Sequence, residues 1–317
     1  MASNTLLSPS IKPERGGYVP AILLNKDLSD QIWIVTGANS GIGLITATQL
    51  AKQNATVILA CRNKQRAEDA LQAIRSQHPQ AKVQFIQLDL ADTRSIRNFV
   101  KEFKLSYQQL HGLMNNAGVM ACPFSRTQDG FEMQMGSNHL GHFLLTNLLL
   151  DYLEHTATVI NPVRVITVSS LAHLSGLINL KDLNYHKRWY FTWSAYGESK
   201  LANYLFAKEL AKRTKGKHII SMSLHPGVVR TELLRHHVIL EWLTNHIFKW
   251  FTIDAWRGAQ TSLWCALSDS VTNEAVNGAY YDINKPGIPI LKSWNFQANN
   301  EKLANDLWEL SSKLVNL

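Results

Sequence analysis

Cysteine is scarce in this chain of 317 residues, which contains only Cys61, Cys122 and Cys265. The three are odd in number and widely separated, so they fit neither a disulfide framework nor a metal site built from paired cysteines. They fit reduced thiols inside a cell. The sequence therefore predicts an intracellular protein and no bound metal.

Long apolar runs are also missing. The most apolar stretches, at 143–153 and 238–253, are interrupted by polar and charged residues, so neither reaches the roughly 18 apolar residues that a membrane-spanning helix needs. The first 30 residues lack the apolar core of a signal peptide. We expect neither an integral membrane protein nor secretion. A cytoplasmic location or one on a membrane surface fits, and a mitochondrial location stays open.

Signatures of nucleic-acid binding are lacking. The chain has no helix-turn-helix or zinc-finger spacing and no basic block interleaved with aromatic residues, so we expect no nucleic-acid partner. Its 32 basic and 24 acidic residues give a formal net charge of +8. This charge favours anionic ligands, phosphates or an acidic membrane surface, or simply promotes solubility. Hydrophobic residues make up 45% of the chain, which is enough for a folded core.

Short apolar runs alternate with helical patterns along the chain. Strands are predicted at 32–36, 56–61, 82–87, 112–116, 163–169, 218–225 and 279–282. Helices are predicted at 41–52, 64–77, 93–106, 136–155, 193–215, 255–267 and 299–315, with an amphipathic, aromatic-rich stretch at 231–251. This alternation predicts a single-domain α/β fold, a Rossmann-type doubly wound parallel sheet with helices on both faces. We place the domain at 28–317, after an unstructured N-terminal lead at 1–27.

A glycine-rich motif, TGANSGIG at 36–43, follows the first predicted strand. Gly37 permits a tight turn, Gly41 lets the backbone approach a pyrophosphate, and Gly43 permits close packing. The helix that follows supplies N–H donors and a positive dipole. We therefore predict that this loop binds the phosphates of a dinucleotide, through Gly37, Asn39, Ser40, Gly41, Ile42 and Gly43. The alternative is a plain loop.

The end of the second strand bears on the choice of dinucleotide. A site for NAD usually has Asp or Glu there, whereas this chain has Arg62 and Lys64. A guanidinium can bind a 2′-phosphate through charge-assisted, bidentate hydrogen bonds. NADP(H) is therefore favoured over NAD(H). The alternative is that both residues are solvated side chains at the start of a helix.

The third and fourth strands also end in candidate cofactor contacts. Because the carboxyl ends of parallel strands meet beside the crevice where the strand order reverses, residues there are expected to face a bound dinucleotide. These residues are Asp89, Leu90, Asn116, Ala117 and Gly118. Each pair or triplet taken alone fits an ordinary turn equally well.

Tyr196 and Lys200 are four residues apart on a predicted helix and so lie on one face of it. A phenol has a pKa of about 10, so acid–base work at neutral pH calls for a nearby cation, and we expect Lys200 to lower the pKa of Tyr196. Such a pair is common by chance. Here, however, Ser170 ends the fifth strand at the same edge of the sheet, and Asn138 lies in the helix after the fourth.

This ordered set of motifs resembles the short-chain dehydrogenase/reductase family. The motifs NNAGVMACPF, NHLGHFLLTNLLL, AYGESKLAN and SLHPGVVRTEL are more narrowly similar to its retinol dehydrogenase branch and to relatives in the chloroplast envelope. The resemblance implies NADP(H)-linked interconversion of an apolar alcohol and an aldehyde or ketone. It implies that Tyr196 exchanges the proton, Ser170 holds the substrate oxygen and Lys200 holds the nicotinamide ribose. Asn138 would position a water in the proton relay.

The resemblance also implies further cofactor contacts, a substrate pocket and a dimer surface. Pro226, Gly227, the valine pair Val228 and Val229, and Thr231 would lie near the nicotinamide end of the cofactor. The segments 177–193 and 231–254 would elaborate a pocket for a lipophilic substrate, although 177–193 fits a surface loop equally well. A homodimer would form through the helices at 136–155 and 193–215.

The chain departs from integral retinol dehydrogenases, because only a polar lead stands where they carry an N-terminal membrane anchor. A soluble or peripheral protein is implied. The aromatic spacing at 242–251 suits an apolar helix face that lines a substrate pocket, dips into a membrane or packs on its own domain. These features also motivate a second hypothesis, in which the chain is a cofactor-binding accessory subunit of a larger membrane-associated assembly.

The histidines are not expected to bind metal. His139 and His142 are three residues apart on a predicted helix, but no third ligand follows at a suitable spacing. We interpret both as structural histidines. His225 is placed close to the site because it ends the sixth predicted strand.

Overall fold

The computed structural model describes residues 19–229 and 253–317. Its strands are β1 (Ile32–Thr36), β2 (Thr56–Cys61), β3 (Val83–Gln87), β4 (Gly112–Asn115), β5 (Val163–Val168), β6 (Ile219–His225) and β7 (Tyr280–Asp282). Its α-helices are α1 (Ala21–Leu24), α2 (Gly41–Lys52), α3 (Lys64–Gln77), α4 (Thr93–Ser106), α5 (Gly141–Leu148), α6 (Leu150–Thr156), α7 (Thr192–Arg213), α9 (Ala255–Leu267) and α10 (Glu301–Leu314).

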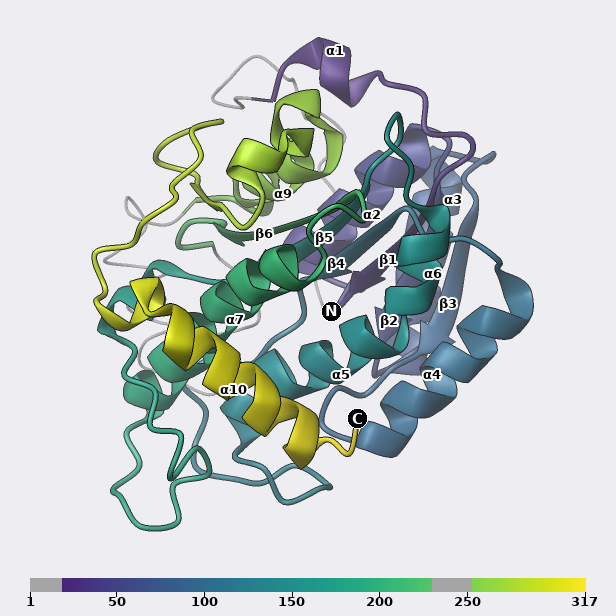
Figure 1. Cartoon of the computed structure of the whole chain (residues 1–317). Coiled ribbons are helices and arrows are strands. Elements are labelled where there is room, and N and C mark those ends of the chain that lie inside the picture. The colour runs from purple at the N-terminus through teal and green to yellow at the C-terminus, as the bar shows by residue number, and fades with distance from the viewer. Residues whose placement is uncertain (1–18, 230–252) are drawn as a thin grey trace.

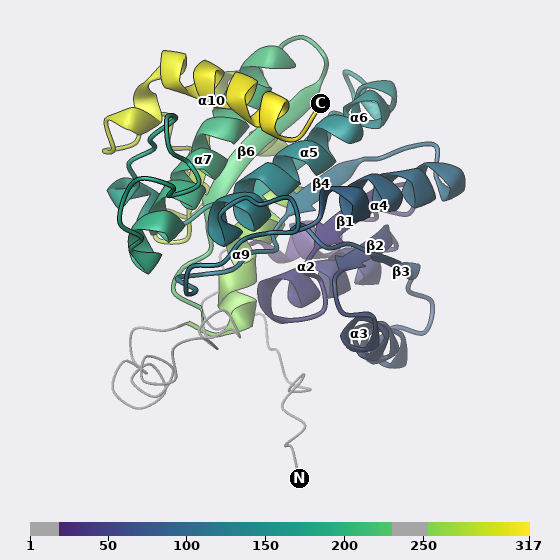
Figure 2. The ribbon, with the colours of Figure 1, turned by 90° about the horizontal axis from the view of Figure 1, so that it is seen from below.

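The described strands form one parallel sheet in the order β3-β2-β1-β4-β5-β6-β7. Helices cover both of its faces, with α4, α5 and α7 on one side and α2, α3 and α9 on the other (Figures 1 and 2). The strands β1, β2, β4, β5 and β6 are almost entirely buried, which explains their unbroken apolar runs. The predicted doubly wound α/β fold is confirmed. The strand order reverses between β1 and β4, and in open α/β sheets ligands bind at such a reversal, outside the carboxyl ends of the strands.

The predicted helix at 136–155 is wrong as a single element. A π-helical turn, η1 (Met135–Leu140), precedes α5, and a break at Leu149 separates α5 from α6. The Glu132 carboxylate accepts hydrogen bonds from the amides of Gln134 (2.8 Å) and Met135 (2.6 Å) and so fixes the start of the turn. π-Turns inside helices often accompany functional sites, and this one carries Asn138.

The expectation of an unstructured lead is wrong for residues 19–27. Val19 and Leu24 are buried, and the Val19 amide donates to the Gln260 side chain (3.2 Å). The Gln53 side chain donates to two carbonyls of this segment, those of Leu23 and Lys26, both at 2.8 Å. The segment therefore packs on α2 and α9. The predicted amphipathic stretch at 231–251 lies outside the described residues.

Helix α10 packs on α5 and α7, the two helices through which the resemblance implied a homodimer (Figure 2). The Trp308 indole lies 4.8 Å from the Phe143 ring and 5.7 Å from the Phe206 ring, between centroids. The Arg213 guanidinium lies 4.7 Å from the same indole. An element of the chain itself thus covers part of the surface where a second copy was expected.

Trp308→Ala should lower the free energy of unfolding by about 3–5 kcal/mol, because it removes a buried aromatic ring and leaves a cavity between helices. Urea denaturation followed by circular dichroism measures the change. Trp294→Ala is the matched control, since Trp294 is 96% exposed and should change stability by no more than about 0.5 kcal/mol. Equal effects of the two substitutions would contradict the packing role of α10.

Candidate active site

The glycine loop joins β1 to α2 at the carboxyl edge of the sheet. Gly37 (φ +65°) and Gly41 (φ +54°) have left-handed backbones, which favour glycine. A Cβ on Gly43 would lie 2.5 Å from both the Gly37 carbonyl oxygen and Asn116 Nδ2. The Asn116 side chain donates to the Thr36 carbonyl (2.7 Å). Asn116 therefore clamps the end of β1 and sets the shape of the loop.

The amino end of α2 has N–H groups that no capping side chain satisfies. Ser40 is the N-cap residue and has an extended backbone, but its side chain accepts no hydrogen bond from the helix. By contrast, Asn63 caps α3, Asp92 caps α4 and Asp254 caps α9. The first amides of α2 and its positive dipole end are therefore available to an anion.

The predicted cofactor residues on β2 and β3 lie at the same edge of the sheet. Arg62 and Lys64 are exposed at the end of β2, and Lys64 Nζ lies 3.8 Å from the Glu68 carboxylate. Asp89 Oδ1 accepts a hydrogen bond from the Ala91 amide (3.0 Å), so this carboxylate also shapes its own turn. The Leu90 backbone packs on α5, where a Cβ on Gly141 would lie 2.5 Å from its carbonyl oxygen.

The predicted catalytic side chains come together at this edge. Tyr196 and Lys200 lie on α7 and are both buried. The Ser170 hydroxyl, just after β5, hydrogen-bonds to the Tyr196 hydroxyl. Lys200 Nζ donates to the Val168 carbonyl at the end of β5 (3.0 Å) and lies 5.6 Å from the centre of the Tyr196 ring.

Asn138 joins this group through its side chain. Its Oδ1 accepts from the Val119 amide (2.8 Å), and its Nδ2 donates to the Val119 carbonyl (2.9 Å) and to Ser199 Oγ (2.9 Å). A Cβ on Gly118 would lie 3.0 Å from Asn138 Oδ1 and 3.7 Å from Lys200 Nζ. The loop after β4, with Ala117 and Gly118, therefore fits closely between these two side chains.

Burial is the main cause of the pKa shifts of both Lys200 and Tyr196. It lowers the pKa of Lys200 from 10.5 to about 8. It raises the pKa of Tyr196 to about 12, with the Ser170 hydrogen bond acting in the opposite direction. Burial therefore dominates the pKa of Tyr196, and the expectation that Lys200 lowers this pKa stays a prediction.

His142 was predicted to be a structural histidine, but it connects the two halves of the site. Its Nε2 lies 2.9 Å from Thr36 Oγ1, and its Nδ1 lies 2.9 Å from the Asn138 carbonyl oxygen. Thr36 Oγ1 also accepts hydrogen bonds from the amides of Asn116 and Ala117. Burial lowers the pKa of His142 to about 4, which keeps the ring neutral. The sequence does carry a signal for this contact, because His142 follows Asn138 by four residues and so lies on the same face of the predicted helix.

Ser199 is a second residue that the sequence reasoning missed. It accepts from Asn138 Nδ2 and donates to the Tyr196 carbonyl (2.8 Å). It follows Tyr196 by three residues on α7, so helical spacing again placed it on the relevant face. Ser199 therefore holds the Asn138 side chain, while His142 contacts the Asn138 backbone.

The turn after β6 contains the remaining predicted contacts. Gly227 has φ +92°, and a Cβ there would lie 2.5 Å from Ile253 Cδ1. Val229 forms a β-bridge with Ile253 and packs on Gly258 of α9. Pro226 is buried, Val228 is exposed, and Thr231 lies outside the described residues. His225 is buried at the end of β6, and its pKa is lowered to about 4 by burial.

His139 is buried, with Nε2 3.0 Å from Ser311 Oγ of α10. Its ring packs on Phe143 and Phe206. The structural interpretation of His139 is confirmed. Within residues 19–229 and 253–317, no three His, Cys, Asp or Glu side chains gather as a metal site would require.

The segment 177–193 is held on the protein by buried polar contacts. The Arg188 guanidinium forms a bidentate ion pair with Glu198 of α7 (2.6 and 2.7 Å). The Tyr190 hydroxyl donates to the Cys122 carbonyl and contacts Glu132. At the start of α7, the Trp193 ring lies 6.3 Å from the Tyr196 ring, between centroids. The segment thus ends beside Tyr196, the predicted catalytic tyrosine.

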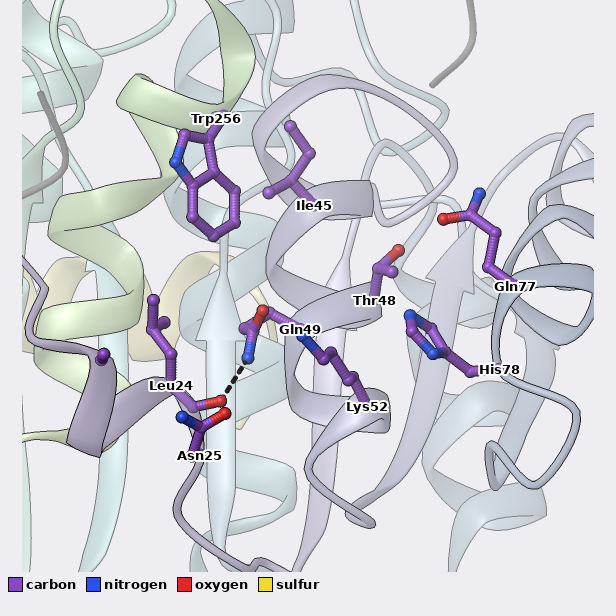
Figure 3. Close-up of a pocket in the computed structure, with 10 residues that line it drawn as sticks. Leu24, Asn25, Ile45, Thr48, Gln49, Lys52, Gln77, His78 and Trp256 are labelled. Carbon is purple, nitrogen blue, oxygen red and sulfur yellow. Dashed lines mark hydrogen bonds between the residues drawn. The ribbon is translucent and has the colours of Figure 1, made fainter. Parts of the chain in front are cut away.

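A pocket on the outer side of α2 lies apart from the predicted catalytic residues. Leu24, Ile45 and Trp256 form its apolar part, and Lys52 and His78 lie at the ends of α2 and α3 (Figure 3). The Gln49 side chain donates to the Leu24 carbonyl (2.9 Å) at its border. Because these helices end at the opposite edge of the sheet, this pocket is separate from the catalytic group.

The glycine loop, the Ser170–Tyr196–Lys200 group and Asn138 match the arrangement that the sequence resemblance implied. The family model described as short chain dehydrogenase matches residues 31–238. The chain belongs to the short-chain dehydrogenase/reductase family. This short-chain dehydrogenase/reductase lies in the retinol dehydrogenase-like branch and is an oxidoreductase acting on CH–OH groups.

Its similarity to known members of the family extends over nearly the whole chain. Mouse retinol dehydrogenase 11 is 45% identical over 92% of this chain and 89% of its own length. Human retinol dehydrogenase 12 is 44% identical over 98% of this chain and 94% of its own. An uncharacterised protein of Mycobacterium paratuberculosis has a similar structure, with a TM-score of 0.74 and 35% identity over 95% of this chain and 98% of its own.

Pseudomonas aeruginosa RhlG, solved as an active-site complex with NADP, superposes on this chain with a TM-score of 0.64. It is 25% identical over 82% of this chain and 97% of its own. In the described part of this short-chain dehydrogenase/reductase, no helix is both long and apolar enough to span a membrane.

Proposed function

We propose that the protein is an NADP(H)-dependent oxidoreductase that interconverts an apolar alcohol and the corresponding aldehyde or ketone, with Tyr196 as the proton donor and acceptor. The observation that carries this proposal is the meeting of Ser170, Tyr196 and Lys200 beside the glycine loop. The relatives named as retinol dehydrogenases support a lipophilic substrate.

The glycine loop fits the pyrophosphate of a dinucleotide. A side chain at Gly43 would collide with Gly37 and Asn116, and the uncapped amides of α2 supply donors where phosphate oxygens would lie. When bound, NADP(H) supplies or accepts the hydride. The protein holds and orients the reactants and moves the proton.

The proton transfer follows from the contacts of Tyr196. With a pKa of about 12, this phenol stays protonated at neutral pH and can donate to the oxygen of a carbonyl substrate. The Ser170 side chain lies beside the Tyr196 hydroxyl, where its single O–H can turn to donate a hydrogen bond to the same substrate oxygen. The Lys200 ammonium lies close enough to stabilise the phenolate that donation leaves behind.

Arg62→Asp tests the choice of cofactor. A direct contact with the 2′-phosphate should make the substitution weaken NADPH binding by about 2 kcal/mol, or roughly 30-fold, while NADH binding changes little. Titration of intrinsic fluorescence with each cofactor measures both affinities.

Lys215→Asp is the control for this experiment, because it makes the same charge change at an exposed turn after α7. It should leave both affinities unchanged. Equal losses for NADPH and NADH in Arg62→Asp would contradict a contact with the 2′-phosphate.

A further inference from the structure

Two loops beside the edge of the sheet that holds Tyr196 carry large apolar side chains that are exposed in the described part of the chain. We call this surface the aromatic rim and define it as Leu174, Leu177, Trp189, Phe191, Trp294 and Phe296. Trp294 is 96% exposed, Trp189 88% and Phe296 74%. Single exposed apolar residues are ordinary, but a group of them marks an interaction surface.

The loops of the aromatic rim are held in place by buried hydrogen bonds. The Asn295 side chain, between Trp294 and Phe296, donates to the carbonyls of His173 (2.9 Å), Leu174 (3.1 Å) and Gly176 (2.8 Å). His173 Nε2 lies 2.8 Å from Ser293 Oγ. The segments around 174–177 and 291–297 therefore form one anchored surface.

The aromatic rim borders the first turn of α7, which carries Tyr196. A Cβ on Gly176 would lie 2.4 Å from the Gly197 carbonyl oxygen, so the 171–176 segment packs directly on that turn. Trp193 contacts the Tyr196 ring from the other segment. In Figure 1 the loops before α7 and before α10 lie on the same side of the molecule, beside the amino end of α7.

The two segments that carry most of the aromatic rim, 177–191 and 283–300, expose basic but no acidic side chains. They expose Lys181, Lys187, Lys285 and Lys292. Their single acidic residue is Asp182, which is buried and accepts hydrogen bonds from the amides of His186 and Lys187. A second copy of this face would bring lysines against lysines, whereas an anionic surface complements them.

We propose that the aromatic rim docks the protein on an anionic lipid surface. Tryptophan and phenylalanine flanked by lysines is the composition that binds at the interface of a bilayer, with the rings at headgroup level and the ammonium groups on lipid phosphates and carboxylates. Docking in this orientation places the amino-terminal part of α7, which carries Tyr196, next to the bilayer. This proposal concerns binding alone and does not depend on the proposed reaction.

The test is co-sedimentation of the full chain with vesicles of phosphatidylcholine and phosphatidylserine, and with vesicles of phosphatidylcholine alone. The double variant Trp189→Ser and Trp294→Ser should lower the partition coefficient on mixed vesicles at least tenfold. Both side chains are almost fully exposed, so the variant should fold normally, which circular dichroism checks. Lys187→Gln with Lys292→Gln should remove much of the preference for phosphatidylserine.

Val159→Ser with Ile160→Ser is the matched control, because these residues are 77% and 88% exposed but precede β5 at the opposite edge of the sheet. It should bind vesicles as the wild type does. The proposal would be overturned if the wild-type protein did not bind mixed vesicles. It would also be overturned if the rim variant bound them as well as the control does. A dimer seen by sedimentation velocity without lipid, and lost in the rim variant, would assign the surface to a second copy instead.

Discussion

Tyr196→Phe is expected to lower kcat/KM for the NADPH-dependent reduction of an apolar aldehyde such as all-trans-retinal by about 10²- to 10⁴-fold. The substitution removes only the hydroxyl that donates the proton and leaves the ring in its buried position beside Trp193. NADPH affinity should stay close to that of the wild type, because the glycine loop is untouched. Consumption of NADPH, followed by its absorbance, measures the rate.

Tyr204→Phe is the matched control. Tyr204 lies on the same helix, is also buried, and has a hydroxyl with no hydrogen-bond partner in the described structure. Its removal should leave kcat/KM unchanged. Undiminished turnover by Tyr196→Phe would contradict the proton-donor role. Binding of NADPH without turnover by the wild type across a broad panel of apolar aldehydes and ketones would instead support the accessory-subunit hypothesis.

The second large effect concerns the pH dependence set by Lys200. In the free enzyme its pKa is about 8, whereas that of Tyr196 is about 12, so the tyrosine stays protonated while the lysine loses its charge. If the ammonium form holds the cofactor ribose and stabilises the phenolate, kcat/KM for reduction should fall about tenfold per pH unit above about pH 8. With NADPH as the varied substrate, kcat/KM reports the ionisation of the free enzyme, so this is the quantity to measure.

Two variants distinguish the deprotonation of Lys200 from a loss of activity caused by unfolding of the protein at high pH. Lys200→Arg keeps the charge at high pH and should move the alkaline limb to higher pH, although the larger guanidinium lowers the maximum rate. Lys208→Met changes a half-buried lysine two turns further along α7 and should leave the limb in place. A limb that is unchanged in Lys200→Arg would rule out Lys200 as its origin.

Much of the fold was predictable because local signals and tertiary structure agree. The helix at 64–77 begins after Asn63, whose side chain accepts from the Arg66 amide, and the helix at 93–106 begins after Asp92, which caps it in the same way. The strands are short apolar runs that the sheet buries on both faces. For this reason β1, β2 and α2 have the bounds that the sequence predicted.

Other elements depended on contacts between distant parts of the chain. The π-turn at Met135–Leu140 starts on the Glu132 carboxylate, and burial of that group sets its position. Helix α1 forms where Gln49 of α2 and Gln53, just after α2, donate hydrogen bonds to the carbonyls around it. No local pattern specifies such contacts, so the continuous helix at 136–155 and the unstructured segment at 19–27 were wrong predictions.

In the candidate site, too, some features follow from the sequence alone and others only from the tertiary structure. The sequence by itself determined the family, the sheet with its glycine loop, and the residues Asn138, Ser170, Tyr196 and Lys200, because motif order and helical spacing are local properties. Only the tertiary structure decided how those side chains ionise and what orients them. Burial moves the pKa of Tyr196 up and that of Lys200 down, and His142 links Thr36 to Asn138 across the crevice. Desolvation and such links arise when distant segments pack together.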